Sequence, residues 1–97
     1  MKVTLDDYVV DVLMRDLVAH DRSPAAFVVF MHLWRHTIGA GRTSVHQSHQ
    51  QIADGTGLSK SSVQTAVRRL VRRRLLGTKR SRRTARPEYV VHRPWAE

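Results

Sequence analysis

The chain has 97 residues, 41% of them hydrophobic, which is enough for one small domain (1–97) with a single core. It has no cysteine, and this excludes a disulfide framework and a thiolate zinc site. No apolar run reaches the roughly 18 residues of a membrane span. The acidic start MKVTLDDYVV is unlike a signal peptide, so we expect a cytoplasmic protein with no membrane partner.

The net charge of +9 is concentrated in the C-terminal part of the chain. Up to Gly57 there are five Lys and Arg against six Asp, whereas from Leu58 onward there are twelve Lys and Arg against two Glu. This asymmetry predicts a face that binds a polyanion. The alternative is a basic tail that is only solvated, but the apolar periodicity inside this region argues against it.

Residues 4–20 are predicted to form a helix. Thr4 is a suitable N-cap, and Asp7 follows it in a position like that of a capping box. The apolar stripe is wider than one side of a small core requires, so the helix is either packed on two sides or pairs with a second copy as a homodimer. The stripe comprises Leu5, Tyr8, Val9, Val12 and Leu13, widened by Val10, Met14 and Leu17.

A second helix is predicted over 24–37, with Ser23 as its N-cap and Pro24 in its first turn. It is apolar on two faces, as expected of a scaffold helix in the middle of a domain. One face carries Phe27, Phe30, Met31 and Trp34, and the other carries Val29 and Leu33. A glycine-containing loop over 38–42 and one short strand within 43–47 follow.

Residues 48–76 read as two helices joined by a tight glycine turn. Ser48 and Gln51 form a capping box that starts the first helix at His49, and Gly55 and Gly57 end it. Ser59 caps the second helix, and Gly77 suits the position just after it. The second helix has an apolar side of Val63, Ala66, Val67, Leu70 and Val71 and an opposite polar side of Ser61, Gln64, Thr65, Arg68 and Arg72.

The last part of the chain, 78–92, is predicted to form a hairpin with strands over 78–81 and 88–92. Its tip, RRTARP, is basic, and Trp95 is expected to pin the tail onto the body. The predicted fold is therefore mainly α with a small antiparallel sheet.

These residues resemble the winged helix-turn-helix family of bacterial DNA-binding proteins, over roughly 23–95. The matching pieces are Ala53 in the first helix of the pair, Gly57 at the turn, Leu58 after it, and the stretch LSKSSVQTAVRRLVRRRLLG. Thr56 departs from the pattern, because an apolar residue is usual there, and the wing tip lacks glycine. The helix at 4–20 would be an addition to the family fold.

The resemblance implies that helix 59–76 enters the major groove of double-stranded DNA. Gln64 and Arg68 would read bases, Thr65 a thymine methyl or a phosphate, and Lys60, Ser61 and Ser62 the phosphates at the helix start. Arg69, Arg72 and Arg73 would neutralise backbone phosphates. On the wing, Arg80, Arg82, Arg83 and Arg86 would follow phosphates or enter the minor groove. Arg74 lies on the core side of the helical wheel and is expected to pair with an acid or lie along the surface.

Catalysis and metal binding are not expected. His32 and His36 have the i, i+4 spacing of two ligands, but the glutamate of a metalloprotease motif is replaced by Leu33. No nucleophile motif is present. We predict no enzyme, no metal and no cofactor.

The leading hypothesis is a nucleoid-associated, homodimeric transcriptional regulator that binds specific DNA sequences. One alternative is a plasmid or phage replication-initiation or maintenance module. Another, of a different class, is a winged-helix module that binds an acidic protein or RNA.

Overall fold

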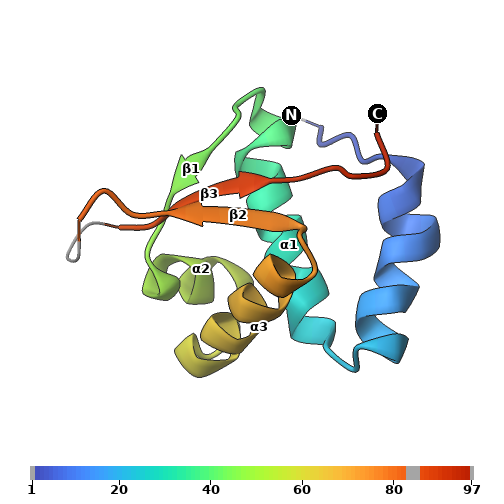
Figure 1. Cartoon of the computed structure of the whole chain (residues 1–97), viewed down its shortest axis with the longest axis horizontal. Coiled ribbons are helices and arrows are strands. Elements are labelled where there is room, and N and C mark those ends of the chain that lie inside the picture. Colours follow the sequence, from blue (N-terminus) through green and yellow to red (C-terminus); the bar gives the residue numbers. More distant parts are fainter. Residues whose placement is uncertain (1, 83–85, 97) are drawn as a thin grey trace.

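In the computed structural model, which describes residues 2–82 and 86–96, an N-terminal helix and three α-helices precede and flank a three-stranded antiparallel sheet (Figure 1). The N-terminal helix lies at the opposite end of the molecule from the β2–β3 hairpin. The predicted fold class, mainly α with a small antiparallel sheet, is confirmed. The other elements are α1 (Pro24–His36), the 3-10 helix η3 (Ile38–Ala40) within the predicted loop, β1 (Val45–His46), α2 (His49–Thr56), α3 (Lys60–Arg72), β2 (Leu76–Lys79) and β3 (Glu88–Val91).

The N-terminal helix covers residues 7–20 and contains two π-helical segments, η1 (Val9–Leu13) and η2 (Asp16–His20). The prediction that it starts at Thr4 is wrong. The Thr4 carbonyl accepts a hydrogen bond of 3.0 Å from the Trp34 indole on α1 instead, which holds this segment extended along α1. The Val9 N–H then bonds to the Asp6 carbonyl at 3.0 Å and opens the helix.

One side of the N-terminal helix packs into the core and the other faces solvent. Val9, Leu13 and Leu17 are buried, four residues apart, and η2 packs against α1. Val10 and Val18 remain 45% and 39% exposed. The wide apolar stripe therefore extends past the face that the rest of this chain covers.

Helix α1 is the scaffold, as predicted. Ser23 caps it by accepting a bond of 3.3 Å from the Ala26 N–H, and Pro24 takes the first helical position. Both of its apolar faces contribute to the core, because α1 packs against α2, α3 and the N-terminal helix together, although Phe27 and Met31 are only half-buried. Burial of a large aliphatic or aromatic side chain stabilises a fold by about 1.5–3 kcal/mol. The buried residues are Ala26, Val29, Phe30, Leu33 and Trp34.

Helix α2 begins with the predicted capping box. The Ser48 hydroxyl accepts from the Gln51 N–H at 3.1 Å, and the Gln51 side chain accepts from the Ser48 N–H at 2.8 Å. Gly57 ends the helix with φ of +81°, a conformation that glycine adopts without steric cost. Gly55 does not end the helix but lies inside it. Thr56, the residue unusual for the family, donates to the Ile52 carbonyl at 2.7 Å and accepts from the Leu58 N–H at 3.3 Å, so it shapes the turn.

Helix α3 ends earlier than predicted, and Arg74 rather than Gly77 takes the left-handed position after it. Arg74 has φ of +60°, and its N–H bonds to the Val71 carbonyl at 3.0 Å. The Leu75 N–H bonds to the Leu70 carbonyl at 2.9 Å, which completes a Schellman motif. Leu70 and Leu75 are both buried, so the sharp turn brings a core residue back beneath the helix. Gly77 consequently lies within β2.

The sheet has the order β1-β3-β2, with β3 in the middle. The predicted short strand within 43–47 is confirmed as β1, whose Val45 pairs with Tyr89. Strand β2 begins two residues before the predicted 78–81, because Leu76 is buried at its start. One face of the sheet packs toward the helices through Leu76, Tyr89 and Val91. The other face carries Lys79, which is exposed, and its partner Glu88, which is half-buried.

A candidate nucleic-acid interface on α3 and the wing

Helix α3 presents a polar face because its apolar residues all lie on the opposite side. Ser59 caps the helix by accepting from the Ser62 N–H at 3.1 Å. Val63, Ala66, Val67 and Leu70 are buried, as the spacing predicted. At about 100° per residue, the centre of the opposite side is taken by the exposed residues Ser61, Thr65, Arg68 and Arg72.

The predicted contact residues at the start of α3 differ in their solvent exposure and in whether their side chains already form hydrogen bonds. Lys60 and Ser61 are exposed. Ser62 is half-buried, and its hydroxyl accepts a bond of 2.9 Å from Ser59, so it takes part in the cap. Ser61, Ser62 and Thr65 also line a hollow of about 230 Å³ against the start of α1, where Ser23 borders it. This side of α3 is therefore a shallow recess lined by serine, threonine and alanine side chains.

The two predicted base-reading residues lie one turn apart on α3. Gln64 is half-buried and Arg68 is exposed. The Arg68 guanidinium lies 3.4 Å from the Thr65 hydroxyl, so the two side chains lean together on the outward face. An amide and a guanidinium at this spacing are the groups that make bidentate contacts with adenine and guanine edges.

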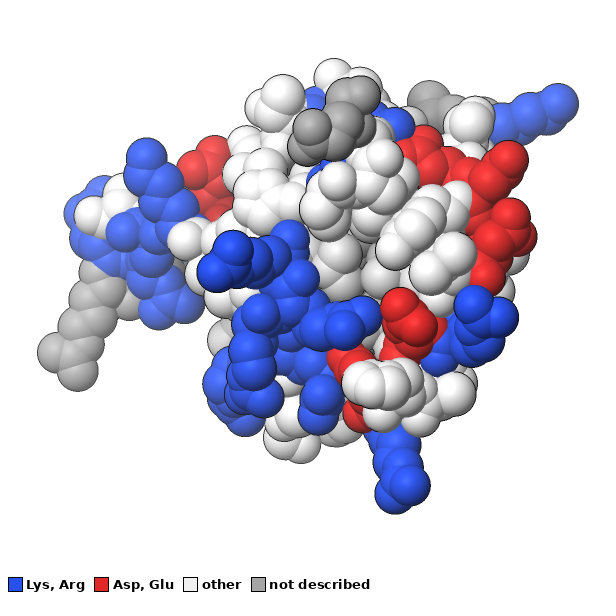
Figure 2. Space-filling model, turned by 45° about the vertical axis from the view of Figure 1, so that its right-hand side comes forward, with Lys and Arg blue, Asp and Glu red and all other residues white. Residues whose placement is uncertain are grey.

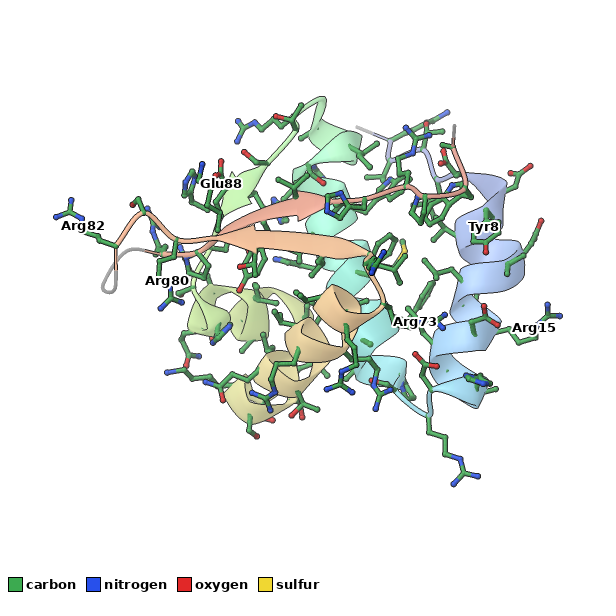
Figure 3. The ribbon with its side chains drawn as sticks, viewed as in Figure 1. Tyr8, Arg15, Arg73, Arg80, Arg82 and Glu88 are labelled. Atoms are coloured by element: carbon green, nitrogen blue, oxygen red, sulfur yellow. The ribbon has the colours of Figure 1, made fainter. Side chains whose placement is uncertain are left out.

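Arg69 and Arg73 occupy the flank of α3 that faces the N-terminal helix, where Figure 3 shows Arg73 pointing toward it. Arg73 Nε lies 3.4 Å from Asp21 Oδ2, and Arg73 Nη2 lies 3.7 Å from Asp16 Oδ2. Arg69 Nη1 lies 3.9 Å from the same Asp21 oxygen. The structure thus separates these two arginines from Arg68 and Arg72.

The helical wheel predicted that Arg74 lies on the core side of α3, but the structure places it elsewhere. The helix ends at Arg72, and the positive φ of Arg74 turns its side chain out to an exposed position. Positions on a helical wheel apply only where the backbone is helical, and the helix ends before Arg74.

The β2–β3 hairpin forms a wing beside α2 and α3. Arg82 is exposed and projects from its outer end, while Arg80 lies on the side toward α2 (Figure 3). Arg86 Nη1 lies 3.4 Å from Gln51 Oε1, the same oxygen that caps α2. The wing is thereby connected to the first turn of α2. The predicted contact Arg83 lies outside the described residues.

His49, the first residue of α2, lies near cations of both α3 and the wing. Burial lowers the pKa of His49 below its ordinary 6.5, and the positive charges of Arg80, Lys60 and Arg68 lower it further. These cations come from the wing and from both halves of α3. Because these three cations surround one imidazole ring, we call this place the cationic junction. The sequence indicated it only through the position of His49 at the first residue of α2.

Figure 2 shows the result on the surface: Lys and Arg side chains gather over α3 and over the wing, and acidic side chains border the α3 group on the side of the N-terminal helix. Such a surface suits a polyanion that spans both basic groups. It also agrees with the charge asymmetry along the chain.

A family model described as a helix-turn-helix domain matches residues 23–76, more than half of the chain. The chain belongs to this helix-turn-helix family. With the sheet that follows the helices, the domain has the winged helix-turn-helix form that the sequence resemblance implied. No curated protein and no solved structure gives a significant match to the chain.

A helix-turn-helix domain indicates DNA binding. The matched range starts at the N-cap of α1 and ends at the first residue of β2, so the N-terminal helix and most of the wing lie outside it. None of the helices in the described part of the chain is long and apolar enough to cross a membrane.

The histidines of α1 have local partners. His32 Nε2 lies 2.8 Å from Gln47 Oε1, and the His32 and His36 rings lie 4.6 Å apart. Burial, followed by the charge of His32, lowers the pKa of His36. Within residues 2–82 and 86–96, no three His, Asp or Glu side chains are grouped as a metal site would require.

Proposed function

We propose that this winged helix-turn-helix protein binds specific sequences of double-stranded DNA as a homodimeric transcriptional regulator. The observation that supports this most directly is the division of α3 into a buried apolar side and an outward side with Thr65, Arg68 and Arg72. In this arrangement α3 lies in the major groove. Its side chains then meet base edges, while the helix itself stays anchored to α1 and α2.

The wing supplies the sequence-independent part of the binding. Arg82 at its outer end and Arg80 near α2 extend the basic surface beyond the length of α3. Contacts of this kind neutralise phosphates and release counterions, so they add affinity without reading sequence. His49 at the cationic junction would sit close to the same phosphates.

Selection of bound duplexes from a random library, followed by fluorescence-anisotropy titrations of Arg68→Ala, tests this function. Arg68→Ala removes a base contact, so it should relax the preference at one base position by about 1–3 kcal/mol. Affinity for the other positions should keep its pattern.

Arg82→Ala is the matched control, because it removes the same charge from the wing. It should weaken binding to all duplexes similarly and reduce the slope of log affinity against log salt by about 0.9. Binding that does not respond to salt, or a library that returns no preferred sequence, would contradict the proposed function.

A further inference from the structure

Two aspartates of the N-terminal region bind two arginines of α3, although these segments are far apart in the sequence. Asp21 contacts both Arg69 and Arg73, and Asp16 contacts Arg73, with N–O distances of 3.4 to 3.9 Å. The contacts come from the end of the N-terminal helix and from the residue that follows it. They close the flank of α3 that would otherwise be free to approach DNA.

Asp21 is held firmly, because its side chain is only 6% exposed. One carboxylate oxygen, Oδ1, lies 2.9 Å from His20 Nδ1. The other, Oδ2, is buried and makes no hydrogen bond within the described residues, so the nearby guanidinium charges of Arg69 and Arg73 stabilise it. The His20 hydrogen bond and these two arginines keep the pKa of Asp21 below its ordinary 3.8 despite burial, so the carboxylate stays charged at neutral pH.

The geometry of α3 makes this contact selective. At 100° per residue, Arg69 and Arg73 lie on the flank beside the buried side, while Arg68 and Arg72 lie near the centre of the outward side. Side-chain exposures of 35% and 36% show that Arg69 and Arg73 are half-covered. An attraction between partly buried charges is screened by salt less than a contact between exposed charges.

We propose that Asp16 and Asp21 act as an acidic clamp, which holds Arg69 and Arg73 away from DNA phosphates and thereby limits the sequence-independent affinity of α3. The inference rests on the proposed function, since it concerns the same DNA-binding face. The clamp removes two cations from non-specific binding but leaves Gln64 and Arg68 free to read bases. The ratio of specific to non-specific affinity therefore rises.

The test compares Asp16→Asn/Asp21→Asn with the wild-type chain on a random-sequence duplex, across a range of salt. Each freed arginine that reaches a phosphate adds about 0.9 to the salt slope. The salt slope of Asp16→Asn/Asp21→Asn should therefore be steeper than that of the wild type by up to roughly 1.8. The ratio of its affinity to the wild-type affinity should rise about tenfold as the salt is lowered from 200 to 50 mM. Asp7→Asn/Asp11→Asn, which neutralises two exposed aspartates of the same helix, controls for the change in total charge.

A second comparison separates the clamp from general electrostatics and from misfolding. Arg69→Ala/Arg73→Ala should leave the wild-type salt slope nearly unchanged, since these side chains are already occupied. In that background the asparagine substitutions should lose their effect on the slope. Circular dichroism of every variant should show the wild-type helix content, and a variant that lacks it is replaced by the single Asp16→Asn, which alters only the more exposed carboxylate.

Two results would overturn the clamp. One is a salt slope for Arg69→Ala/Arg73→Ala that is smaller than the wild-type slope by about 1.8, because the arginines would then already contact phosphates in the wild type. The other is a folded Asp16→Asn/Asp21→Asn variant with the wild-type slope. Either result leaves the proposed function intact, whereas a wild-type chain that fails to bind duplex DNA at any salt concentration would end the proposed function itself.

Discussion

Arg74 occupies a backbone conformation that glycine usually takes after a helix. Its φ of +60° places it at the C′ position of the Schellman motif that ends α3. For a residue with a Cβ atom this conformation costs about 1–2 kcal/mol. Gly57 meets the same demand at the end of α2 without that cost, since its φ is +81°.

We predict that Arg74→Gly stabilises the protein. Relief of the left-handed strain exceeds the extra backbone entropy that glycine loses on folding, which is about 0.5–1 kcal/mol, so a net gain of up to about 1 kcal/mol is expected. Urea unfolding should show a higher midpoint with an unchanged slope. Arg74→Ala removes the same charge but keeps the strain, and an equal gain in that variant would refute the explanation.

At the scale of elements, the N-terminal helix has two roles that the helix-turn-helix itself does not require. It buries Val9, Leu13 and Leu17 against the body. Its Asp16 reaches Arg73 of α3, and Asp21, the residue that follows it, reaches Arg69 and Arg73. It also leaves Val10 and Val18 exposed on its outer side. Exposed valines on an element outside the matched family range support the proposal that two copies pair through this helix.

A Val10→Lys or Val18→Lys substitution tests the pairing. If two copies pair through this helix, sedimentation of the wild type should give twice the 11.1 kDa mass of the chain. At least one variant should shift toward 11.1 kDa, because burying a lysine in the interface is costly. Val28→Lys is the control, because Val28 is 38% exposed and lies on α1 and not on the N-terminal helix. A wild-type chain that sediments at 11.1 kDa would rule out this pairing.

For the molecule as a whole, the two ends of the chain are joined through Asp6. Arg93 donates two hydrogen bonds to its carboxylate, at 2.8 and 2.9 Å, and the Trp95 indole donates a third at 2.9 Å. The Trp95 ring stacks on Tyr8 with centroids 4.7 Å apart. The tail after β3 is thus pinned to the N-terminal region, as the sequence predicted for Trp95.

Asp6→Asn should lower the thermal stability at neutral pH. The Trp95 hydrogen bond and then those from Arg93 lower the pKa of Asp6 below its ordinary 3.8, so the folded state favours the charged carboxylate. That contribution is present above 3.8 and is lost as the pH falls through the lower folded value. A well-formed surface ion pair contributes about 1 kcal/mol, or roughly 4–8 °C in Tm for a domain of this size.

The measurement is the difference in Tm between wild type and Asp6→Asn from neutral to strongly acidic pH. The difference should shrink as Asp6 becomes protonated. Asp7→Asn, an exposed neighbour with the same charge, should show a smaller difference. A Tm difference that stays constant on acidification would mean that the carboxylate charge does not stabilise the tail.

Most local elements could be predicted from the sequence, because caps, glycines and apolar spacing act within a few residues. The capping box at Ser48, the N-caps Ser23 and Ser59 and the buried row on α3 were all predictable in this way. The family resemblance and the charge asymmetry likewise indicated a winged helix-turn-helix with a basic face.

Which cations are available on that face depends on contacts between segments that are far apart in the sequence. Arg69 and Arg73 differ from Arg68 and Arg72 in their surroundings, since Asp16 and Asp21 arrive from a segment about fifty residues earlier. The start of the N-terminal helix was also set by a distant partner, the Trp34 indole, and the end of α3 by the burial of Leu75 in the core. Periodicity along one helix carries no information about what another segment places beside it.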